Sequence, residues 1–213
     1  MPRYSKYIIP LFCLFLFCRC NKTTPGNNVY TLVDSAFKAN FNYQPGSYWI
    51  YRDSLSGRVD SFYVTQNMTA YVTPKWTESI NIQVSEKNTD GSHPADSGAW
   101  VYTLEGTDAA LNYFDSSNEL VFAYNPFFIY PPGTAFLYDD QVSDTPVILN
   151  TMGSYTLNGN TYSNVTDIEH HATGYPANYF FINDSAGIIK MGLSTSSGAL
   201  SHVWELQRYH IIR

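Results

Sequence analysis

The sequence has no cysteine after position 20 and has few basic residues. Disulfides, a cysteine nucleophile and a cysteine-ligated zinc site are therefore excluded from the chain beyond Cys20. Lys and Arg total 12 against 18 Asp and Glu, which gives a formal net charge of −6. Because nucleic-acid binding needs a positively charged surface, this balance argues against a nucleic-acid partner.

Long hydrophobic runs are scarce as well. The apolar run from Tyr7 to Phe17 is shorter than the roughly 20 residues that a membrane-spanning helix needs. It follows the basic residues Arg3 and Lys6 and contains Pro10, which favours the hydrophobic region of a secretory signal over a buried N-terminal helix. We therefore predict a lipoprotein-type signal peptide at residues 1–19.

All three cysteines, Cys13, Cys18 and Cys20, lie in or directly after this run. A cysteine in this position resembles the acylated cysteine of bacterial lipoprotein signals, although Arg19 and Phe17 stand where those signals usually carry a small residue. We predict that Cys20 is acylated, because a polar linker begins there, and Cys18 is the alternative. The other interpretation is that the three cysteines are only apolar residues of a cleaved signal.

The predicted cleavage also changes the charge of the chain. It removes three basic residues and no acidic one, so the remaining chain is more acidic than the full sequence. Anionic lipid repels an acidic surface, so attachment would depend on acyl chains such as palmitate. We expect a lipid-anchored protein of the cell envelope, at the outer membrane, facing either the periplasm or the exterior.

Beyond a linker at residues 20–40, most of the chain has the period of β-strands. Helical spacing occurs over residues 32–41 only, whereas residues 76–86 alternate between apolar and polar side chains. Asn158-Gly159 is a typical two-residue hairpin turn. Further strands are predicted at residues 47–53, 58–65, 99–105, 111–115, 120–124, 153–157, 160–170, 178–183, 187–193 and 200–212.

These runs predict an all-β fold over residues 41–213. We expect a single antiparallel domain of about ten strands, whose sheet is curled or barrel-like. A sandwich of two packed sheets is the alternative.

Several segments resemble a known group of proteins. Gly46, Trp49 and Tyr51 form a Gly-x-x-Trp-x-Tyr opening, and Tyr-x-x-Val at residues 162–165 and Gly-Ile-Ile-Lys at residues 187–190 follow later. Together they resemble uncharacterised lipoproteins of the Bacteroidota over residues 43–209. The resemblance implies an exported, lipid-anchored β domain, and it carries over no catalytic residue. The same residues also have structural explanations, as core anchors or as a turn glycine with positive φ.

The motifs of common enzymes are missing. The sequence has no G-x-S-x-G, no H-E-x-x-H, no P-loop and no G-x-G-x-x-G. A Ser-His-Asp arrangement or a carboxylate pair would have to be assembled by the fold. We predict no enzymatic activity and no cofactor, and a hydrolase is the enzymatic alternative.

One polar cluster has ligands that suit a metal ion. On an extended strand Asp167, Glu169 and His171 project from the same face. Two carboxylates and one imidazole can bind a divalent cation if a neighbouring strand completes the site. The alternative is a solvated strand face.

Residues 121–138 combine many aromatic side chains with three prolines. Because proline does not fit a central strand, we predict a stiff, irregular connection. Its rings either form the wall of a ligand site or cap the sheet and join the core. The candidate ligand-binding residues are Tyr124, Phe127, Phe128, Tyr130, Phe136 and Tyr138.

Two functions remain from this reasoning. The first is a non-catalytic binding or interaction module for an envelope protein or a glycan, which predicts a filled core and an exposed aromatic patch. The second is a carrier whose curled sheet holds a lipid-like apolar ligand, which predicts a deep apolar cavity.

Overall fold

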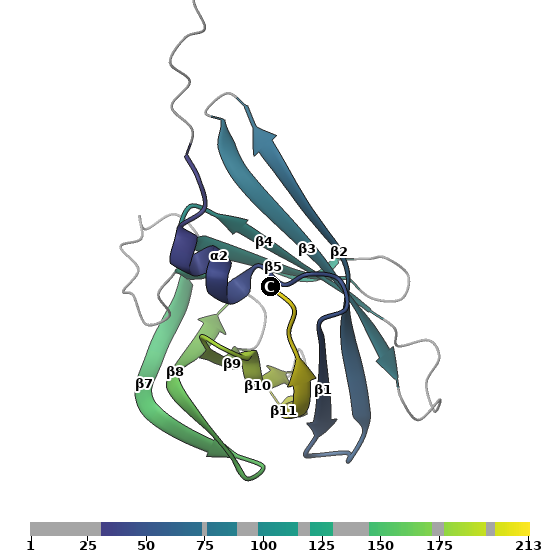
Figure 1. The fold of residues 1–213 in the computed structure, drawn as a ribbon. Helices are drawn as coiled ribbons and strands as arrows, with labels where there is room; N and C mark the ends of the chain where they lie inside the picture. The colour runs from purple at the N-terminus through teal and green to yellow at the C-terminus, as the bar shows by residue number, and fades with distance from the viewer. Residues whose placement is uncertain are drawn as a thin grey trace, which may run out of the picture.

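The computed structural model describes residues 31–73, 76–88, 98–114, 120–129, 145–171, 177–194 and 199–213. The described residues form one short helix and eleven strands (Figure 1). The predicted signal peptide, the three cysteines and the first part of the linker lie outside them. In chain order the elements are α2 (Ser35–Phe41), β1 (Tyr48–Asp53), β2 (Val59–Val72), β3 (Thr77–Asn88), β4 (Ala99–Glu105), β5 (Asp108–Phe114), β6 (Leu120–Ile129), β7 (Thr145–Leu157), β8 (Asn160–His171), β9 (Asn178–Asn183), β10 (Gly187–Ser194) and β11 (Leu200–His210).

All eleven strands belong to one sheet in the order β6-β5-β4-β3-β2-β1-β11-β10-β9-β8-β7. The pairings between these strands are antiparallel, and β1 pairs with both β2 and β11, so the first and last strands lie side by side. The sheet curls around a shared interior (Figure 1). The predicted all-β curled sheet is therefore confirmed, and the two-sheet sandwich is wrong.

Local sequence explains much of this arrangement. In β3 the side chains of Ile80, Ile82 and Val84 are all buried in the core, as their alternation predicts. The turn between β7 and β8 has positive φ at Asn158 (50°) and Gly159 (80°), which two-residue hairpins require. Strands β4 and β9 coincide with their predicted ranges.

Helix α2 covers one end of the interior. Asp34 caps it by accepting hydrogen bonds from the backbone N–H groups of Ala36 and Phe37, both at 2.9 Å. Phe37 and Phe41 are buried in the core. Residues 33–40, which the sequence analysis assigned to the linker, thus pack as part of the β domain. Among the described residues, no helix has the length and apolar character needed to cross a membrane.

The opening residues of the resemblance act as core anchors. Trp49 Nε1 donates a hydrogen bond to the Ala186 carbonyl (2.7 Å), and the Tyr51 hydroxyl donates to the Ile188 carbonyl (2.6 Å). Gly187 between them has φ of +78°, and an added Cβ would lie 2.6 Å from the Tyr43 hydroxyl. Both the backbone and the close approach of Tyr43 therefore require glycine at this position.

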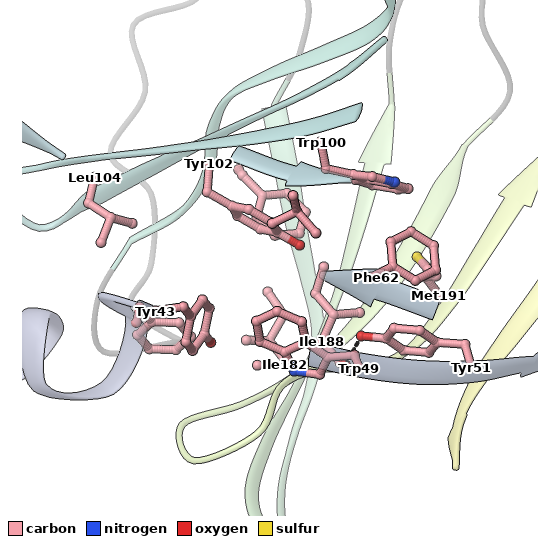
Figure 2. A pocket seen from close by; sticks show the side chains of 14 residues that line it. Tyr43, Trp49, Tyr51, Phe62, Trp100, Tyr102, Leu104, Ile182, Ile188 and Met191 are labelled. Atoms are coloured by element: carbon pink, nitrogen blue, oxygen red, sulfur yellow. Dashed lines mark hydrogen bonds between the residues drawn. The ribbon is translucent and has the colours of Figure 1, made fainter. Parts of the chain in front are cut away.

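The described residues enclose an interior cavity that is lined mostly by apolar side chains, among them Tyr43, Trp49, Phe62 and Ile182 (Figure 2). Its volume is about 30 Å³. That space holds about one water molecule, whereas pockets for small ligands measure roughly 300–1,000 Å³. The core that the described residues form is therefore filled.

Candidate functional site

The candidate site lies on the face of β7, β8, β9 and β10 that is turned away from the core. We call it the outer-face patch, and its members are Leu149, Tyr155, Asp167, Glu169, Tyr179, Phe181 and Lys190. All of these except Tyr155 line a shallow depression of about 300 Å³. Strand alternation places Asp167, Glu169, Tyr179 and Phe181 there, because the intervening Ile168, Phe180 and Ile182 point into the core and are fully buried.

Strand register brings the polar and aromatic members together. Asp167 is paired with Phe181, Glu169 with Tyr179, and Phe181 in turn with Lys190. Paired residues on adjacent strands project from the same face with their Cβ atoms roughly 5 Å apart. Strands β8, β9 and β10 therefore present one continuous surface of rings and charges.

Phe181 contacts the two other rings of the patch. Tyr155 and Phe181 stack with centroids 5.1 Å apart and an interplanar angle of 28°. Tyr179 meets Phe181 edge-on at 5.9 Å. Tyr179 also lies over Gly192, where any Cβ would collide with its ring. These contacts fix the rings in place, so little side-chain entropy is lost when a ligand stacks on them.

Charges surround the rings. Lys190 Nζ lies 5.9 Å from the Phe181 centroid and 3.1 Å from Glu205 Oε1. Burial and the neighbouring Glu169 raise the pKa of Asp167, and Lys190 opposes this effect. Asp167 Oδ1 is shielded from solvent and has no hydrogen-bond partner among the described residues. The patch thus offers an acceptor that a bound donor can satisfy.

The predicted metal site overlaps with this patch. Asp167 and Glu169 lie on one face, as the sequence predicted, and both line the depression. The side chain of His171 lies outside the described residues. Among the side chains that are described, no three from His, Cys, Asp and Glu come together as metal ligands. The metal site stays a prediction.

The predicted aromatic wall has a different structure from the one expected. Residues 120–129 form β6, an edge strand. The strand predicted at residues 120–124 is therefore confirmed, and the prediction of an irregular connection is wrong for residues 125–129. Pro126 is accommodated because its strand is at an edge and the register with β5 shifts beside it, between the partners of Ala109 and Leu111. The local sequence of a strand does not show whether that strand lies at the edge of its sheet.

Only one of the six predicted aromatic ligand-binding residues has a described side chain. Phe127 is fully buried, stacks on His170 with centroids 5.3 Å apart, and meets Phe180 edge-on at 4.9 Å. The Phe127 carbonyl also lies 2.9 Å from His170 Nε2. Phe127 is therefore part of the core, where it packs β6 against β8 and β9. Tyr124 and Phe128 lie in β6 with side chains outside the described set, and Tyr130, Phe136 and Tyr138 lie outside it entirely.

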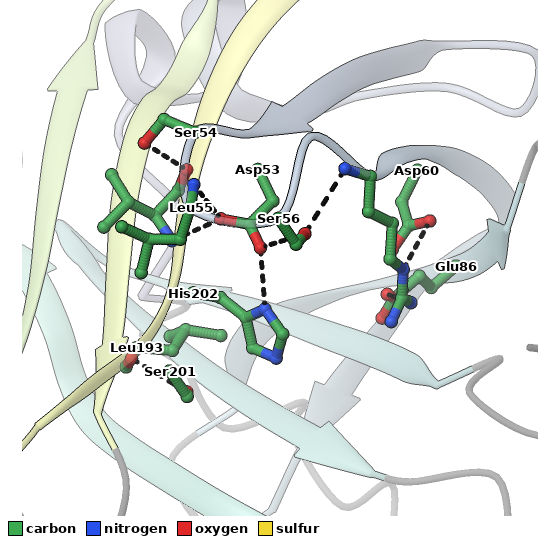
Figure 3. A network of polar contacts seen from close by, with 11 residues as sticks. Asp53, Ser54, Leu55, Ser56, Asp60, Glu86, Leu193, Ser201 and His202 are labelled. Atoms are coloured by element: carbon green, nitrogen blue, oxygen red, sulfur yellow. Dashed lines mark hydrogen bonds and ion pairs between the residues drawn. The ribbon is translucent and has the colours of Figure 1, made fainter.

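A polar network that the sequence analysis did not find surrounds Asp53 (Figure 3). This buried carboxylate accepts hydrogen bonds from the Leu55 and Val203 backbone N–H groups and from the Ser56 hydroxyl, and its Oδ2 lies 3.0 Å from His202 Nδ1. Burial alone would raise the pKa of Asp53, but these hydrogen bonds lower it to about 2. In the sequence, the only local indication of this network was an acidic residue at a turn.

The Asp53 network does not have the order of a catalytic triad. Ser56 Oγ donates to Asp53 Oδ2 at 2.6 Å, so the carboxylate stands between the hydroxyl and His202. In a Ser-His-Asp triad the imidazole occupies the middle position and takes the hydroxyl proton. Asp53 instead ties the turn after β1 to the start of β11.

A second buried cluster pairs two carboxyl groups. Arg58 Nη2 lies 2.6 Å from Asp60 Oδ2 and 3.6 Å from Glu86 Oε1, and its guanidinium lies over the Trp204 ring at 5.5 Å. Burial, a hydrogen bond to Asp60 and the charge of Asp60 raise the pKa of Glu86 to about 8. At neutral pH Glu86 therefore holds a proton that faces Asp60.

Comparisons with known proteins add little. No family model matches the chain, and no curated protein matches it. Nine chains among the solved structures match. One of them is described as a "putative lipoprotein" from Parabacteroides distasonis ATCC 8503. It shares 13% identity, with a TM-score of 0.48, over 80% of this chain and 97% of that one.

Proposed function

We propose that this chain is a lipid-anchored cell-envelope protein without catalytic activity that binds a glycan on its outer-face patch. The observation that carries the proposal is the contrast between two surfaces. The outer-face patch combines contacting rings with an unpaired carboxylate oxygen at a depression of about 300 Å³, whereas the interior cavity measures about 30 Å³.

The chemistry of the patch suits a sugar. Flat rings such as those of Tyr155 and Phe181 pack against the apolar C–H face of a pyranose. The carboxylates of Asp167 and Glu169 accept hydrogen bonds from hydroxyl groups, and Lys190 donates them. Because two acidic groups line the depression, we expect neutral or amino sugars to bind better than acidic ones.

The two alternatives have less support. A lipid-like ligand would need an interior many times larger than the cavity that the described residues enclose. A hydrolase would need a reactive group that meets substrate, whereas the side chains of Asp53 and Asp60 are fully buried and each is held by neighbouring polar groups.

We expect Phe181→Ala to weaken glycan binding by roughly tenfold or more, because removal of a central stacked ring costs at least about 1.4 kcal/mol at such a site. The measurement is titration of the purified full chain with neutral oligosaccharides selected on a glycan array. Tyr209→Ala is the matched control, since its ring is exposed on β11 outside the patch. Equal affinity of Phe181→Ala and the control would overturn the site, and failure of every glycan to bind would overturn the ligand class.

The lipid anchor has a separate test. We expect Cys20→Ser to release the protein from membranes and to abolish incorporation of a labelled fatty acid, because the acyl chains supply the attachment. Cys18→Ser is the matched control and should stay attached and labelled. The reverse pattern would identify Cys18 as the acceptor, and attachment of both single variants and the double variant would overturn acylation.

A further inference from the structure

The outer ends of β2 and β3 form a ribbon that extends past the rest of the sheet (Figure 1). Strand β1 pairs with β2 only as far as Tyr63, whereas β2 continues to Val72. From Thr65 onward most β2 side chains are exposed. Among the described strands, none pairs with the β2 side of the ribbon beyond Tyr63.

The end of this ribbon is apolar. We call it the hairpin tip and define it by Met68, Tyr71, Val72 and Trp76, whose exposed fractions are 45%, 51%, 50% and 37%. Leu32, at the start of the described chain, is 56% exposed. Half of the ten exposed large hydrophobic side chains of the described residues thus belong to the tip or to Leu32. Such a concentration marks an interaction surface.

Thr31, the first described residue, lies at this same place. Thr31 forms a parallel bridge with Thr77, and its carbonyl accepts a hydrogen bond from the Glu78 N–H (2.8 Å). Thr77 is paired in turn with Val72. Because the bridge is parallel and β3 runs away from the tip, the described chain also begins at the tip and runs away from it. Only ten residues separate Thr31 from Cys20, a reach of at most roughly 35 Å.

The charge of the tip also suits a lipid surface. Residues 61–77 contain no Asp or Glu, although the chain has 18 acidic residues. The next acidic residue, Glu78, is buried and lies 2.6 Å from Lys38 Nζ. Anionic headgroups would therefore meet little repulsion here. Tyr and Trp are also the side chains enriched at the membrane interface.

We infer that the hairpin tip inserts into the interfacial region of the phospholipid bilayer to which the chain is anchored. This inference rests on the proposed lipid anchor, and it adds a second membrane contact that sets the orientation of the domain. The turn that follows β1, which lies at the opposite end of β2, then points away from the bilayer.

Fluorescence quenching by brominated lipid tests this contact. The acylated full chain is reconstituted into phosphatidylethanolamine and phosphatidylglycerol vesicles that contain phosphatidylcholine brominated near the headgroup. Trp49, Trp100 and Trp204 are buried in the core, so quenching should come from Trp76 and should fall several-fold in Trp76→Phe. The matched control places a tryptophan at the opposite end, as Leu55→Trp in the Trp76→Phe background, because Leu55 is also exposed.

The outcomes separate the anchor from the tip. Vesicle flotation with strong quenching of Trp76 and weak quenching of the Leu55→Trp control is the expected result. Flotation with equal quenching of the two would overturn the tip insertion and leave the anchor standing. A chain that does not float with the vesicles would overturn both.

Discussion

Replacing Asp53 with alanine is expected to lower the free energy of unfolding by about 3 to 5 kcal/mol. The carboxylate is fully buried and receives four hydrogen bonds from the turn after β1 and from the start of β11. Its removal leaves the Val203 N–H, the Ser56 hydroxyl and His202 without this acceptor. Urea unfolding at neutral pH measures the change.

Asp108→Ala is the control for this substitution. Asp108 is exposed at the start of β5, so its loss should change the free energy of unfolding by no more than about 0.5 kcal/mol. The pH dependence gives a second readout. Because the folded pKa of about 2 lies below the ordinary value of 3.8, the Asp53 contribution is fully present above pH 4 and is lost as the pH falls toward 2. An Asp53→Ala protein as stable as the control would contradict the account.

Glu86 should make the protein less stable at alkaline pH. Its folded pKa of about 8 is above the ordinary value of 4.5, so the folded state binds the proton more tightly than the unfolded chain does. The contribution of Glu86 to the free energy of unfolding is therefore greatest below pH 4.5. It declines as the pH rises through 8, by roughly 2 to 4 kcal/mol in total. Glu86→Gln, which imitates the protonated carboxyl, should remove most of this decline.

The measurement is the urea midpoint of the wild type and Glu86→Gln between pH 5 and pH 9. Glu105→Gln serves as the control, because Glu105 is exposed at the end of β4 and should leave the decline unchanged. A Glu86→Gln protein whose stability falls with pH as steeply as the wild type would show that Glu86 is ionised in the folded state at neutral pH.

Sequence pattern predicted those elements that short-range rules determine. The alternation of β3 and the Asn158-Gly159 turn each depend on adjacent residues, and both have the expected geometry. The pattern placed Asp167 and Glu169 on one face correctly, because alternation decides this as well. It could not place Tyr155, Phe181 and Lys190 beside them, because register between distant strands brings these residues together.

Other features depend on contacts that no local pattern contains. Asp53 and His202 are 149 positions apart, and they meet only because β1 and β11 are neighbours in the sheet. Glu78 lies among the buried residues of β3, where Lys38 from α2 pairs with it at 2.6 Å. Pro126 argued against a strand, but the edge position of β6 tolerates it.

The central claim is that a ligand binds on the outer-face patch of a domain with a filled interior. Native mass spectrometry of the gently purified, unacylated chain tests this claim most directly. The account predicts a bare mass after purification and the addition of one oligosaccharide mass on titration, with the addition lost in Phe181→Ala. A purified chain that carries an apolar adduct extractable into organic solvent would contradict it, because the cavity of about 30 Å³ that the described residues enclose cannot hold such a molecule.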